Sequence, residues 1–215
     1  MLEILLIRHG QTDWNRDHRI MGHRPVPLNL SGRRQAGAVA RALRKIPLDL
    51  IVTSPFRRAV ETARVIAKGR RIALEHSHAV AEIGYGLWIG RTFEEVREEK
   101  NFKVYHTTPK LACAPGGEKM TAVHRRAVGL IERLRKRYEK GRIAVVSHAD
   151  VIKAILIHYL GLDLNELMKL RIDNCTVSLL WFQEARHRVM SINCPVNPKH
   201  LFSLTDQVPQ HKKIR

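Results

Sequence analysis

Two arginines and two histidines follow shortly after apolar segments of the sequence. They are Arg8, His9, Arg58 and His148. Arginine presents a planar fork of N–H donors that fits phosphate oxygens, and histidine can act as a nucleophile or as an acid and base near neutral pH. If the apolar segments are parallel strands of one sheet, their carboxyl ends meet at one edge, where such sheets bind ligands. The four side chains would then form a cationic site for a tetrahedral dianion.

The elements that must position these side chains alternate between strand and helix. This alternation predicts an α/β fold, a three-layer sandwich with a mostly parallel central sheet and an antiparallel edge. The apolar runs and stripes place the strands at 2–7, 49–53, 72–74 and 142–147, a closing hairpin at 176–182 and 188–192, and helices at 31–45, from 54, at 92–100, 120–138 and 151–160, with a helical turn from 163.

Two local signals refine the expected helices. Ser54 suits an N-cap and Pro55 suits the first helical position, so a helix is expected to begin there. Thr92 and Glu95 match a capping box at the start of another helix. The segment from Phe102 to Gly117 ends in a proline–glycine turn and contains a second proline, which predicts a long surface loop.

Length and composition predict one domain. The chain has 215 residues, of which 44% are hydrophobic and 27% are charged, as in ordinary globular proteins. A chain of this size buries roughly 70% of its unfolded surface, so it needs no stabilising crosslink. We expect a single catalytic domain at 1–195 and a basic, flexible C-terminal tail at 196–215.

The charge is strongly basic. Lys and Arg number 38 against 20 Asp and Glu, which gives a formal net charge of +18. Such an excess favours anionic partners and keeps a nucleic-acid-binding or phospho-ligand-binding protein with little turnover open as an alternative. However, aromatic residues make up only 6% of the chain, and the sequence contains no known nucleic-acid motif. Nucleic acid is therefore the less favoured partner.

The N-terminal apolar run and the number of cysteines indicate the cellular compartment. The first apolar run stops at Arg8 and has no basic residues before it, unlike a signal peptide, and no run approaches a membrane span. The three cysteines, Cys113, Cys175 and Cys194, give an odd count without a Cys-x-x-Cys pair. We expect a reduced, cytoplasmic protein with no membrane partner.

Five motifs in order make the sequence resemble the histidine phosphatase superfamily, the phosphoglycerate-mutase-like family. Arg-His-Gly alone would be weak evidence, but five ordered motifs with suitable spacing are specific. The resemblance covers residues 1 to about 182, and its motifs lie at 6–15, 54–63, 82–90, 115–118 and 145–148.

The resemblance implies a role for each matched residue. His9 would be the nucleophile that forms a phosphohistidine, and Arg8, Arg58 and His148 would hold the phosphoryl oxygens. Glu82 would donate a proton to the leaving oxygen and later take one from water. Residues beside these are assigned to substrate binding: Gly10, Gln11, Thr12, Asn15 and Ala149.

Physical chemistry adds two expectations about these roles. A backbone carbonyl that accepts from one nitrogen of His9 would fix the tautomer and leave the other nitrogen free to attack. Glu82 must be protonated before the leaving group departs, and we expect the charge of the bound phosphoryl group to raise its pKa. Because preorganised cations can neutralise the phosphoryl group, no metal and no cofactor is expected.

The implied activity is that of a histidine acid-type phosphatase, a phosphoric monoester hydrolase acting on a small phosphorylated metabolite. A mutase is the alternative, but the longer cofactor-dependent phosphoglycerate mutases of the family carry an insert after the matching glutamate that this chain lacks.

Two positions of this sequence depart from the family's pattern. Pro25 stands where many relatives have an acidic residue, and Asp150 follows His148 closely, where we expect it to cap a helix and face away. A homodimer is the commonest oligomer in general.

Other residues have plainer explanations. Glu118 is expected to favour a helix start rather than to shape the pocket. His76 and His78 resemble a metal pair only superficially. Trp14 and Trp88 are assigned equally to the core and to the substrate pocket.

Overall fold

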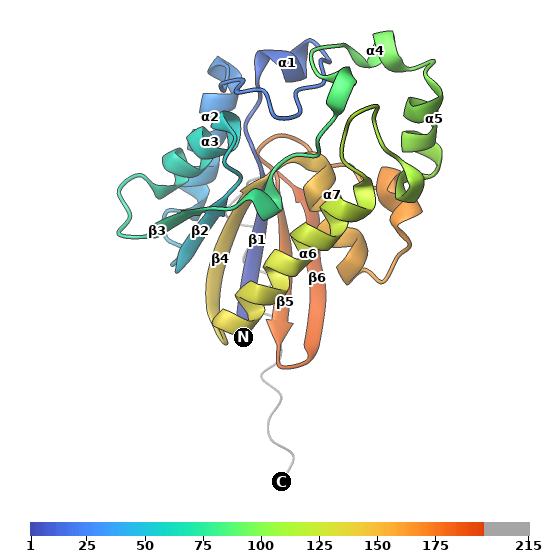
Figure 1. Ribbon diagram of the computed structural model, residues 1–215. Coiled ribbons are helices and arrows are strands. Elements are labelled where there is room, and N and C mark those ends of the chain that lie inside the picture. Colours follow the sequence, from blue (N-terminus) through green and yellow to red (C-terminus); the bar gives the residue numbers. More distant parts are fainter. Residues whose placement is uncertain (196–215) are drawn as a thin grey trace.

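A six-stranded sheet forms the centre of the computed structural model, which describes residues 1–195 (Figure 1). The expected basic tail at 196–215 lies outside the described residues. The strands are β1 (Leu2–Arg8), β2 (Leu50–Thr53), β3 (Ala73–His76), β4 (Gly141–Ser147), β5 (Val177–Gln183) and β6 (Arg186–Cys194).

The order of the strands is β3-β2-β4-β1-β5-β6. The pairs β3–β2, β2–β4 and β4–β1 are parallel, whereas β5 runs antiparallel to β1 and β6 antiparallel to β5. The prediction of a mostly parallel sheet with an antiparallel edge is therefore confirmed.

Helices cover both faces of the sheet, and a group of short helices lies above its top edge in Figure 1. The helices are α1 (Asp13–Arg16), α2 (Leu30–Leu43), α3 (Arg57–Ala67), α4 (Phe93–Val96), α5 (Lys100–Thr107), α6 (Met120–Arg137) and α7 (Ala149–Tyr159), with 3₁₀ turns at His78–Val80, Gly86–Trp88, Pro109–Leu111 and Leu164–Lys169.

The two faces of the sheet carry separate hydrophobic cores. Successive strand residues point to opposite faces, so Leu6 packs in the core under α6 and α7, and its neighbour Ile7 packs in the core under α2 and α3. The same alternation recurs on β4, where Val145 and Val146 enter different cores. These two cores define the three layers that the sequence predicts.

The site's position follows from where the helices go after each strand. The chain leaves β1 toward α2 on one face, whereas it leaves β4 toward α7 on the opposite face. Since β1 and β4 are neighbours, the loops after them diverge and open a crevice at the carboxyl ends of the strands. Arg8 pairs with Ser147 at this end, so the following residues, His9 and His148, face the same crevice.

Two local predictions differ from the structure. α3 begins at Arg57 with Phe56 as its N-cap, so Ser54 and Pro55 precede the helix instead of starting it. The hydroxyl of Ser54 accepts a hydrogen bond from the N–H of Phe56 at 3.3 Å and thus caps the turn before the helix.

The expected long loop from Phe102 to Gly117 is also wrong, because its first part belongs to α5 and a 3₁₀ turn follows. Phe102 and Tyr105, one helical turn apart, are buried against Trp88. This apolar spacing outweighs the turn residues that follow it. The capping box of Thr92 and Glu95 is confirmed, although that helix ends already at Val96.

Glycine is required where the loop after β1 meets the start of α2. A Cβ on Gly10 would lie 2.5 Å from the carbonyl oxygen of Gly32, and a Cβ on Gly32 would lie 2.0 Å from that of Gln11. The two backbones touch, so neither position accepts a side chain without movement. This close approach fixes the loop that carries His9.

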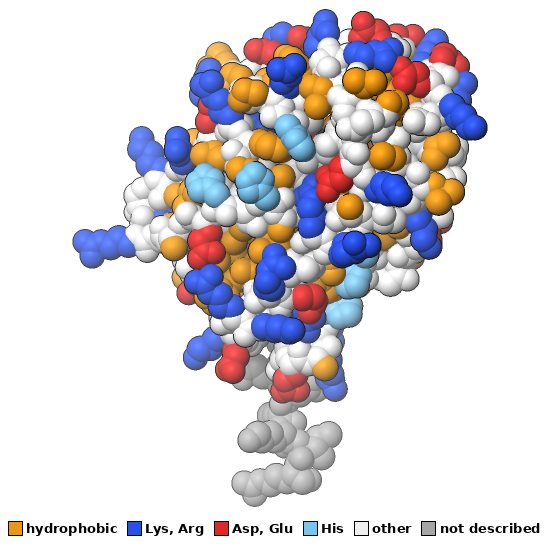
Figure 2. Space-filling view, viewed as in Figure 1, with side chains coloured by type: hydrophobic (Ala, Val, Ile, Leu, Met, Phe, Trp, Pro, Cys, Tyr) orange, Lys and Arg blue, Asp and Glu red, His pale blue; other side chains and the backbone are white. Residues whose placement is uncertain are grey.

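Basic side chains are spread over the face of the molecule shown in Figure 2, with acidic ones among them. They do not gather into a single patch on this face. None of the helices within residues 1–195 is both long and apolar enough to cross a membrane.

We predict that Leu6→Ala destabilises the protein by about 2–5 kcal/mol, because the truncation leaves a cavity in the core beneath α7. Leu6 is fully buried (0% exposed). The free energy of unfolding in a denaturant titration measures the effect. The matched control Leu111→Ala, at a side chain that is 74% exposed, should change it by less than about 0.5 kcal/mol. Equal effects of the two substitutions would contradict the core assignment.

Candidate active site

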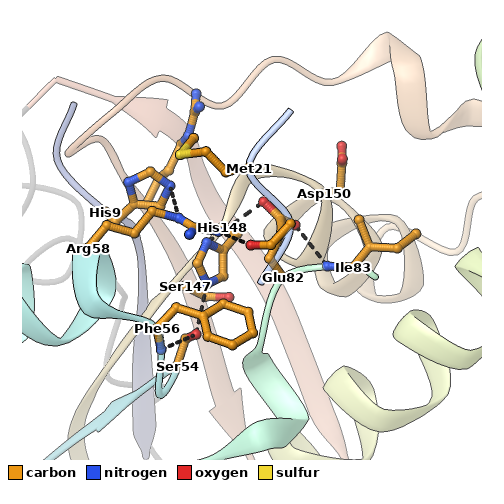
Figure 3. Close-up of polar contacts among 12 residues, drawn as sticks. His9, Met21, Ser54, Phe56, Arg58, Glu82, Ile83, Ser147, His148 and Asp150 are labelled. Atoms are coloured by element: carbon orange, nitrogen blue, oxygen red, sulfur yellow. Dashed lines mark hydrogen bonds and ion pairs between the residues drawn. The ribbon is translucent and has the colours of Figure 1, made fainter. Parts of the chain in front are cut away.

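The structure brings together the five residues that the sequence singles out for catalysis. Figure 3 shows His9, Arg58, His148 and Glu82 converging beyond the ends of the strands, and Arg8 ends β1 directly before His9. The rings of His9 and His148 lie 5.1 Å apart between centroids. Arg8 and His9 lie at and directly after the end of β1, and Arg58 lies in α3. Glu82 lies in the loop after β3, and His148 directly precedes α7.

His9 is held in one tautomer by its own loop. Its Nδ1 lies 2.7 Å from the carbonyl oxygen of Gly10, which can only accept, so Nδ1 carries the proton. Its Nε2 then has a free lone pair, which accepts a hydrogen bond from Nε of Arg58 at 3.2 Å. The expectation of a backbone carbonyl that fixes the tautomer is confirmed, and the acceptor is Gly10.

The environment also keeps His9 uncharged. Burial lowers the pKa of His9 well below its usual value, and the neighbouring charges of Arg58 and Arg8 lower it further. A neutral imidazole with a free Nε2 lone pair is the form that a nucleophile requires.

Arg58 is fully buried and anchored by two carbonyls. Its Nη2 donates to Gly22 at 2.8 Å and its Nη1 to Arg24 at 3.2 Å. Burial lowers the pKa of Arg58 to about 10, with Arg8 acting in the same direction and Glu82 opposing it, so the guanidinium stays charged at neutral pH. The neighbouring Arg57 is exposed and pairs with Glu61 at 2.7 Å. The motif assignment to Arg58 and not Arg57 agrees with this difference in burial.

Arg8 has one N–H donor without a hydrogen-bond partner among the described residues. Its Nη1 donates to the carbonyl of Ile172 at 2.7 Å, whereas its buried Nε has no hydrogen-bond partner among the described residues. Burial lowers the pKa of this guanidinium, because the charge is kept away from water. A buried donor without a partner is costly, so an anion at this point would be bound favourably.

His148 caps the start of α7 and faces Glu82. Its Nε2 lies 2.8 Å from the hydroxyl of Ser54, and its Nδ1 lies 3.7 Å from Oε2 of Glu82. The Ser54 hydroxyl, which also accepts from the N–H of Phe56, thus holds the His148 ring through Nε2. Burial and the nearby arginine Arg58 lower the pKa of His148 well below its usual value.

Glu82 lies on a loop that other residues hold from outside the catalytic group. Its carbonyl accepts from Nη2 of Arg126 at 3.4 Å and faces Nε2 of His23 at 3.2 Å. Arg126 also pairs with both carboxylate oxygens of Glu118, and Oε2 of Glu118 accepts from the N–H of Gly84 as well. Glu118, expected mainly to favour a helix start, therefore secures the Glu82 loop together with Arg126 of α6.

The pKa of Glu82 is raised to about 7, first by burial and then by the negative charge of Asp150. Arg58, the N–H of Ile83 and Arg8 act in the opposite direction. The prediction of a raised pKa agrees with this direction, but its stated cause was incomplete. Burial and Asp150 raise the pKa of this carboxyl in the protein by itself, before any phosphoryl group is bound.

The residues assigned to substrate binding occupy different positions. Gln11, Asn15 and Ala149 line a cavity of about 520 Å³ together with Arg8 and Glu82. Gly10 and Thr12 are not among the residues that line it. The backbone N–H of Gly10 donates to Thr62 at 3.0 Å, and the hydroxyl of Thr12 caps α1 by accepting from the N–H of Asn15 at 3.1 Å.

The cavity has the size of a small-molecule site and a mixed charge. Sites for small ligands span roughly 300–1,000 Å³. Glu82 also lines a second cavity of about 600 Å³ on the side of His23, His78 and Arg126. The charged residues that line the first cavity are Arg8, Arg19, Glu82, Asp150, Lys153, Arg171 and Asp173.

Several site residues carry no motif that sequence reasoning could detect. Asn174 donates to the backbone carbonyl of His9 at 2.9 Å and so holds the nucleophile from the far side. Its position just before β5 was the only signal, since β5 pairs with β1. Arg126 lies within the basic stretch of α6 and cannot be told from its neighbours by type.

The structure shows where the side chains of Trp14, Trp88 and Asp150 lie. Trp88 is buried in the core and donates to Glu99 at 2.7 Å, whereas Trp14 lines the substrate-sized cavity. Asp150 lies in the first turn of α7, but His148 is the N-cap. The expectation that Asp150 caps the helix is therefore wrong. Its buried carboxylate is instead bound by Tyr85 and Tyr105, and Asp150 is among the residues that line the same cavity as Glu82.

The fold and the site define a class of protein. An α/β sheet presents two neutral histidines, two charged arginines and a carboxyl group of raised pKa at one crevice. Such a set fits an enzyme that handles phosphoryl groups.

Comparison with known proteins gives the family. Residues 4–195 match the model of the histidine phosphatase superfamily (branch 1), and the chain belongs to this family. It is 31% identical over 195 residues to "Phosphoserine phosphatase 1" of Hydrogenobacter thermophilus, which covers 90% of this chain and 92% of that protein.

A relative with a different name is nearly as similar. The chain is 30% identical over 188 residues to "Probable phosphoglycerate mutase GpmB" of Cronobacter sakazakii, with 86% of this chain and 87% of the relative covered. Among solved structures, a mutant phosphoserine phosphatase from Entamoeba histolytica in complex with phosphoserine superposes with a TM-score of 0.82 at 28% identity, covering 94% of this chain and 100% of that one. The protein is thus an enzyme of the histidine phosphatase superfamily.

The raised pKa of Glu82 makes a prediction about stability. A carboxyl whose pKa is about 7 when folded and near 4.5 when unfolded takes up a proton on folding between these values, so its contribution to stability falls as pH rises through that window. Glu82→Gln removes this dependence. The gain in unfolding free energy over the native protein should therefore grow between pH 4.5 and 7 and level off above about pH 7. Thermal or denaturant unfolding at pH 5, 6, 7 and 8 measures it, and a gain that is equal at every pH would contradict the raised pKa.

Proposed function

We propose that the protein is a metal-independent phosphatase that hydrolyses phosphomonoesters of small metabolites through a phosphohistidine on His9. The observation that carries this proposal is the state of His9. Its Nδ1 is bound to Gly10, and its Nε2 offers a lone pair beside the Arg58 guanidinium. A nucleophile that is neutral, oriented and next to a cation is prepared to attack an anionic phosphorus centre.

Substrate binding has to replace one hydrogen bond. Nε of Arg58 donates to Nε2 of His9, the same lone pair that would attack phosphorus. A phosphoryl oxygen can take over this donor, which frees the lone pair and moves the bond to the group that gains charge. The unpartnered Nε of Arg8 supplies a second donor to the phosphoryl oxygens.

The chemical steps balance with these side chains alone. In the first step the Nε2–P bond forms, the bond from phosphorus to the ester oxygen breaks, and Glu82 gives its proton to that oxygen. In the second step water attacks phosphorus, the P–Nε2 bond breaks, and Glu82 receives a proton from the water. A pKa of about 7 suits both directions of transfer, and it makes the enzyme acid-type because Glu82 must start protonated.

Two features support independence from a metal. The charge on the phosphoryl group can be offset by two cationic side chains, Arg58, which is fully buried, and Arg8, which is partly buried. Arginine forks match three equatorial oxygens as bound metal ions do in other phosphoryl-transfer enzymes.

The size of the cavity, about 520 Å³, supports a small substrate. The three unpaired cysteines support a cytoplasmic location.

A mutase is the second candidate, favoured by the relative named as a phosphoglycerate mutase. The two activities share the phosphohistidine step and differ in what attacks it. Incubation with 3-phosphoglycerate separates them. Release of inorganic phosphate supports the phosphatase, whereas conversion to 2-phosphoglycerate without phosphate release supports the mutase.

We predict that His9→Ala lowers the rate of p-nitrophenyl phosphate hydrolysis on the order of 10³-fold or more, because the nucleophile is lost. The assay contains EDTA, and the native protein should keep its activity there. A phosphoryl label on the native protein should be labile to acid and absent from the variant. The matched control His158→Ala, at an exposed histidine of α7, should retain activity. Equal rates for native protein and His9→Ala would contradict the proposal, and a native protein with no phosphatase activity that still binds phospho-ligands would support a phospho-ligand-binding protein instead.

Arginine geometry is tested by a neighbouring pair. We predict that Arg58→Lys lowers kcat/KM roughly 10²–10³-fold, because a single ammonium group cannot replace the fork that reaches Gly22, Arg24 and His9. The control Arg57→Lys changes the adjacent exposed arginine and should alter kcat/KM by less than about 2-fold. Similar losses in both variants would argue against a specific role for Arg58.

A further inference from the structure

Asp150 is a buried carboxylate that the proposed phosphatase mechanism does not use. It accepts hydrogen bonds from the hydroxyls of Tyr85, at 2.5 Å, and of Tyr105. The two tyrosine hydroxyls are themselves 3.1 Å apart. Nζ of Lys153, one turn along α7, lies 3.4 Å from the other carboxylate oxygen. Four polar side chains thus form one closed cluster.

This cluster joins three segments that are distant in the sequence. Asp150 and Lys153 belong to α7, and Tyr105 belongs to α5. Tyr85 belongs to the loop that carries Glu82 and follows Glu82 by three residues. The hydrogen bond from Tyr85 to Asp150 therefore ties the Glu82 loop to α7. α7 also begins directly after His148, so the proton donor and a phosphate ligand share one support.

The cluster stays negatively charged at its centre. Burial acts to raise the pKa of Asp150, but Lys153 and the hydroxyls of Tyr105 and Tyr85 outweigh it, so the pKa is lowered. Asp150 is consequently ionised at every pH at which the enzyme would work.

Among the described residues, the charges that act most strongly on Glu82 are Arg58 and Arg8, which are positive, and Asp150, which is negative. Arg8 and Arg58 favour the ionised form, and the neutral ring of His148 lies 3.7 Å away. Asp150 favours the protonated form. The groups facing Glu82 or its backbone from the surrounding elements are Arg8 of β1, His23, Arg58 of α3, Tyr85, Tyr105 of α5, Arg126 of α6, His148 and Asp150.

We propose that Asp150 is a positioning residue for Glu82: its carboxylate fastens the Glu82 loop to α7 through the two tyrosine hydroxyls and holds a fixed negative charge in the cavity that Glu82 lines. The inference rests on the proposed role of Glu82. Two cationic arginines are needed for the phosphoryl group, and both favour the ionised form of Glu82, which burial opposes. Asp150 counteracts them at Glu82 while the hydroxyls and Lys153 satisfy its own charge.

A merely structural role for Asp150 predicts something different. An acidic residue in the first turn of a helix stabilises that helix through its dipole, and loss of the carboxylate would then weaken folding or activity equally at every pH. A positioning role through charge moves the pH at which activity is lost. The position of the alkaline limb of kcat/KM therefore separates the two roles.

The test is a pH profile of kcat/KM from pH 5 to 9 with phenyl phosphate, whose poor leaving group needs a proton from Glu82. For Asp150→Asn, which keeps the shape of the side chain, we expect the alkaline limb to move to lower pH by about one unit. Activity would fall about 10-fold relative to the native enzyme at pH 8 and much less at pH 5.5. With p-nitrophenyl phosphate, whose leaving group departs without a proton, the loss at pH 8 should be smaller.

Two further variants control for geometry and folding. Tyr105→Phe removes one hydrogen bond but no charge, so its alkaline limb should stay where the native limb is. Lys153→Met removes a positive charge from the cluster, so its limb should move to higher pH; this variant also provides the readout if Asp150→Asn does not fold. Limbs that coincide in the native enzyme, Asp150→Asn and Lys153→Met would overturn the inference. His9→Ala as active as the native protein would instead overturn the proposed function.

Discussion

The site depends on keeping cations charged and histidines neutral where the protein shields them from most of the solvent. Burial alone lowers the pKa of His9, of His148 and of both arginines, but the arginines start so high that they remain cationic. The same burial raises the pKa of Glu82. Desolvation is thus the largest cause of both the unprotonated nucleophile and the protonated acid, while the phosphate-binding arginines stay charged. The packing of the loops at the sheet edge is what maintains that desolvation.

Much of this arrangement could be predicted from the sequence, because the signals are local. Strand ends followed by Arg8, His9 and His148 predict the shared edge, and the alternation of strand and helix predicts the three layers. The tyrosine cluster could not be predicted, since Tyr85 and Asp150 are 65 residues apart and neither belongs to a motif that names its partner. The loop expected in place of α5 failed for a related reason: burial of Phe102 and Tyr105 depends on Trp88, which no local pattern reveals.

The basic charge of the chain divides into two physically different parts. Arg8, Arg58 and Arg126 are drawn inward, where each is tied to backbone carbonyls or a carboxylate and serves the catalytic loops. Most of the other lysines and arginines within residues 1–195, such as Arg57, lie at the surface, where ion pairs contribute little. The net charge of +18 therefore describes the surface far more than the site. At long range it favours the approach of any anionic ligand, and it does not select one.

The order of the strands has a consequence for how the protein is made. β1 lies between β4 and β5, so residues 2–8 pair with residues that follow them by well over a hundred positions. The N–H of His9 is bound by Ser147, and its carbonyl by Asn174. During synthesis the nucleophile emerges more than a hundred residues before Ser147 and Asn174, the groups that hold it. The N-terminal strand must wait unpaired until β4 and β5 emerge, a long-range closure that slows folding and exposes an apolar strand meanwhile. No catalytic centre exists until nearly the whole domain has been translated.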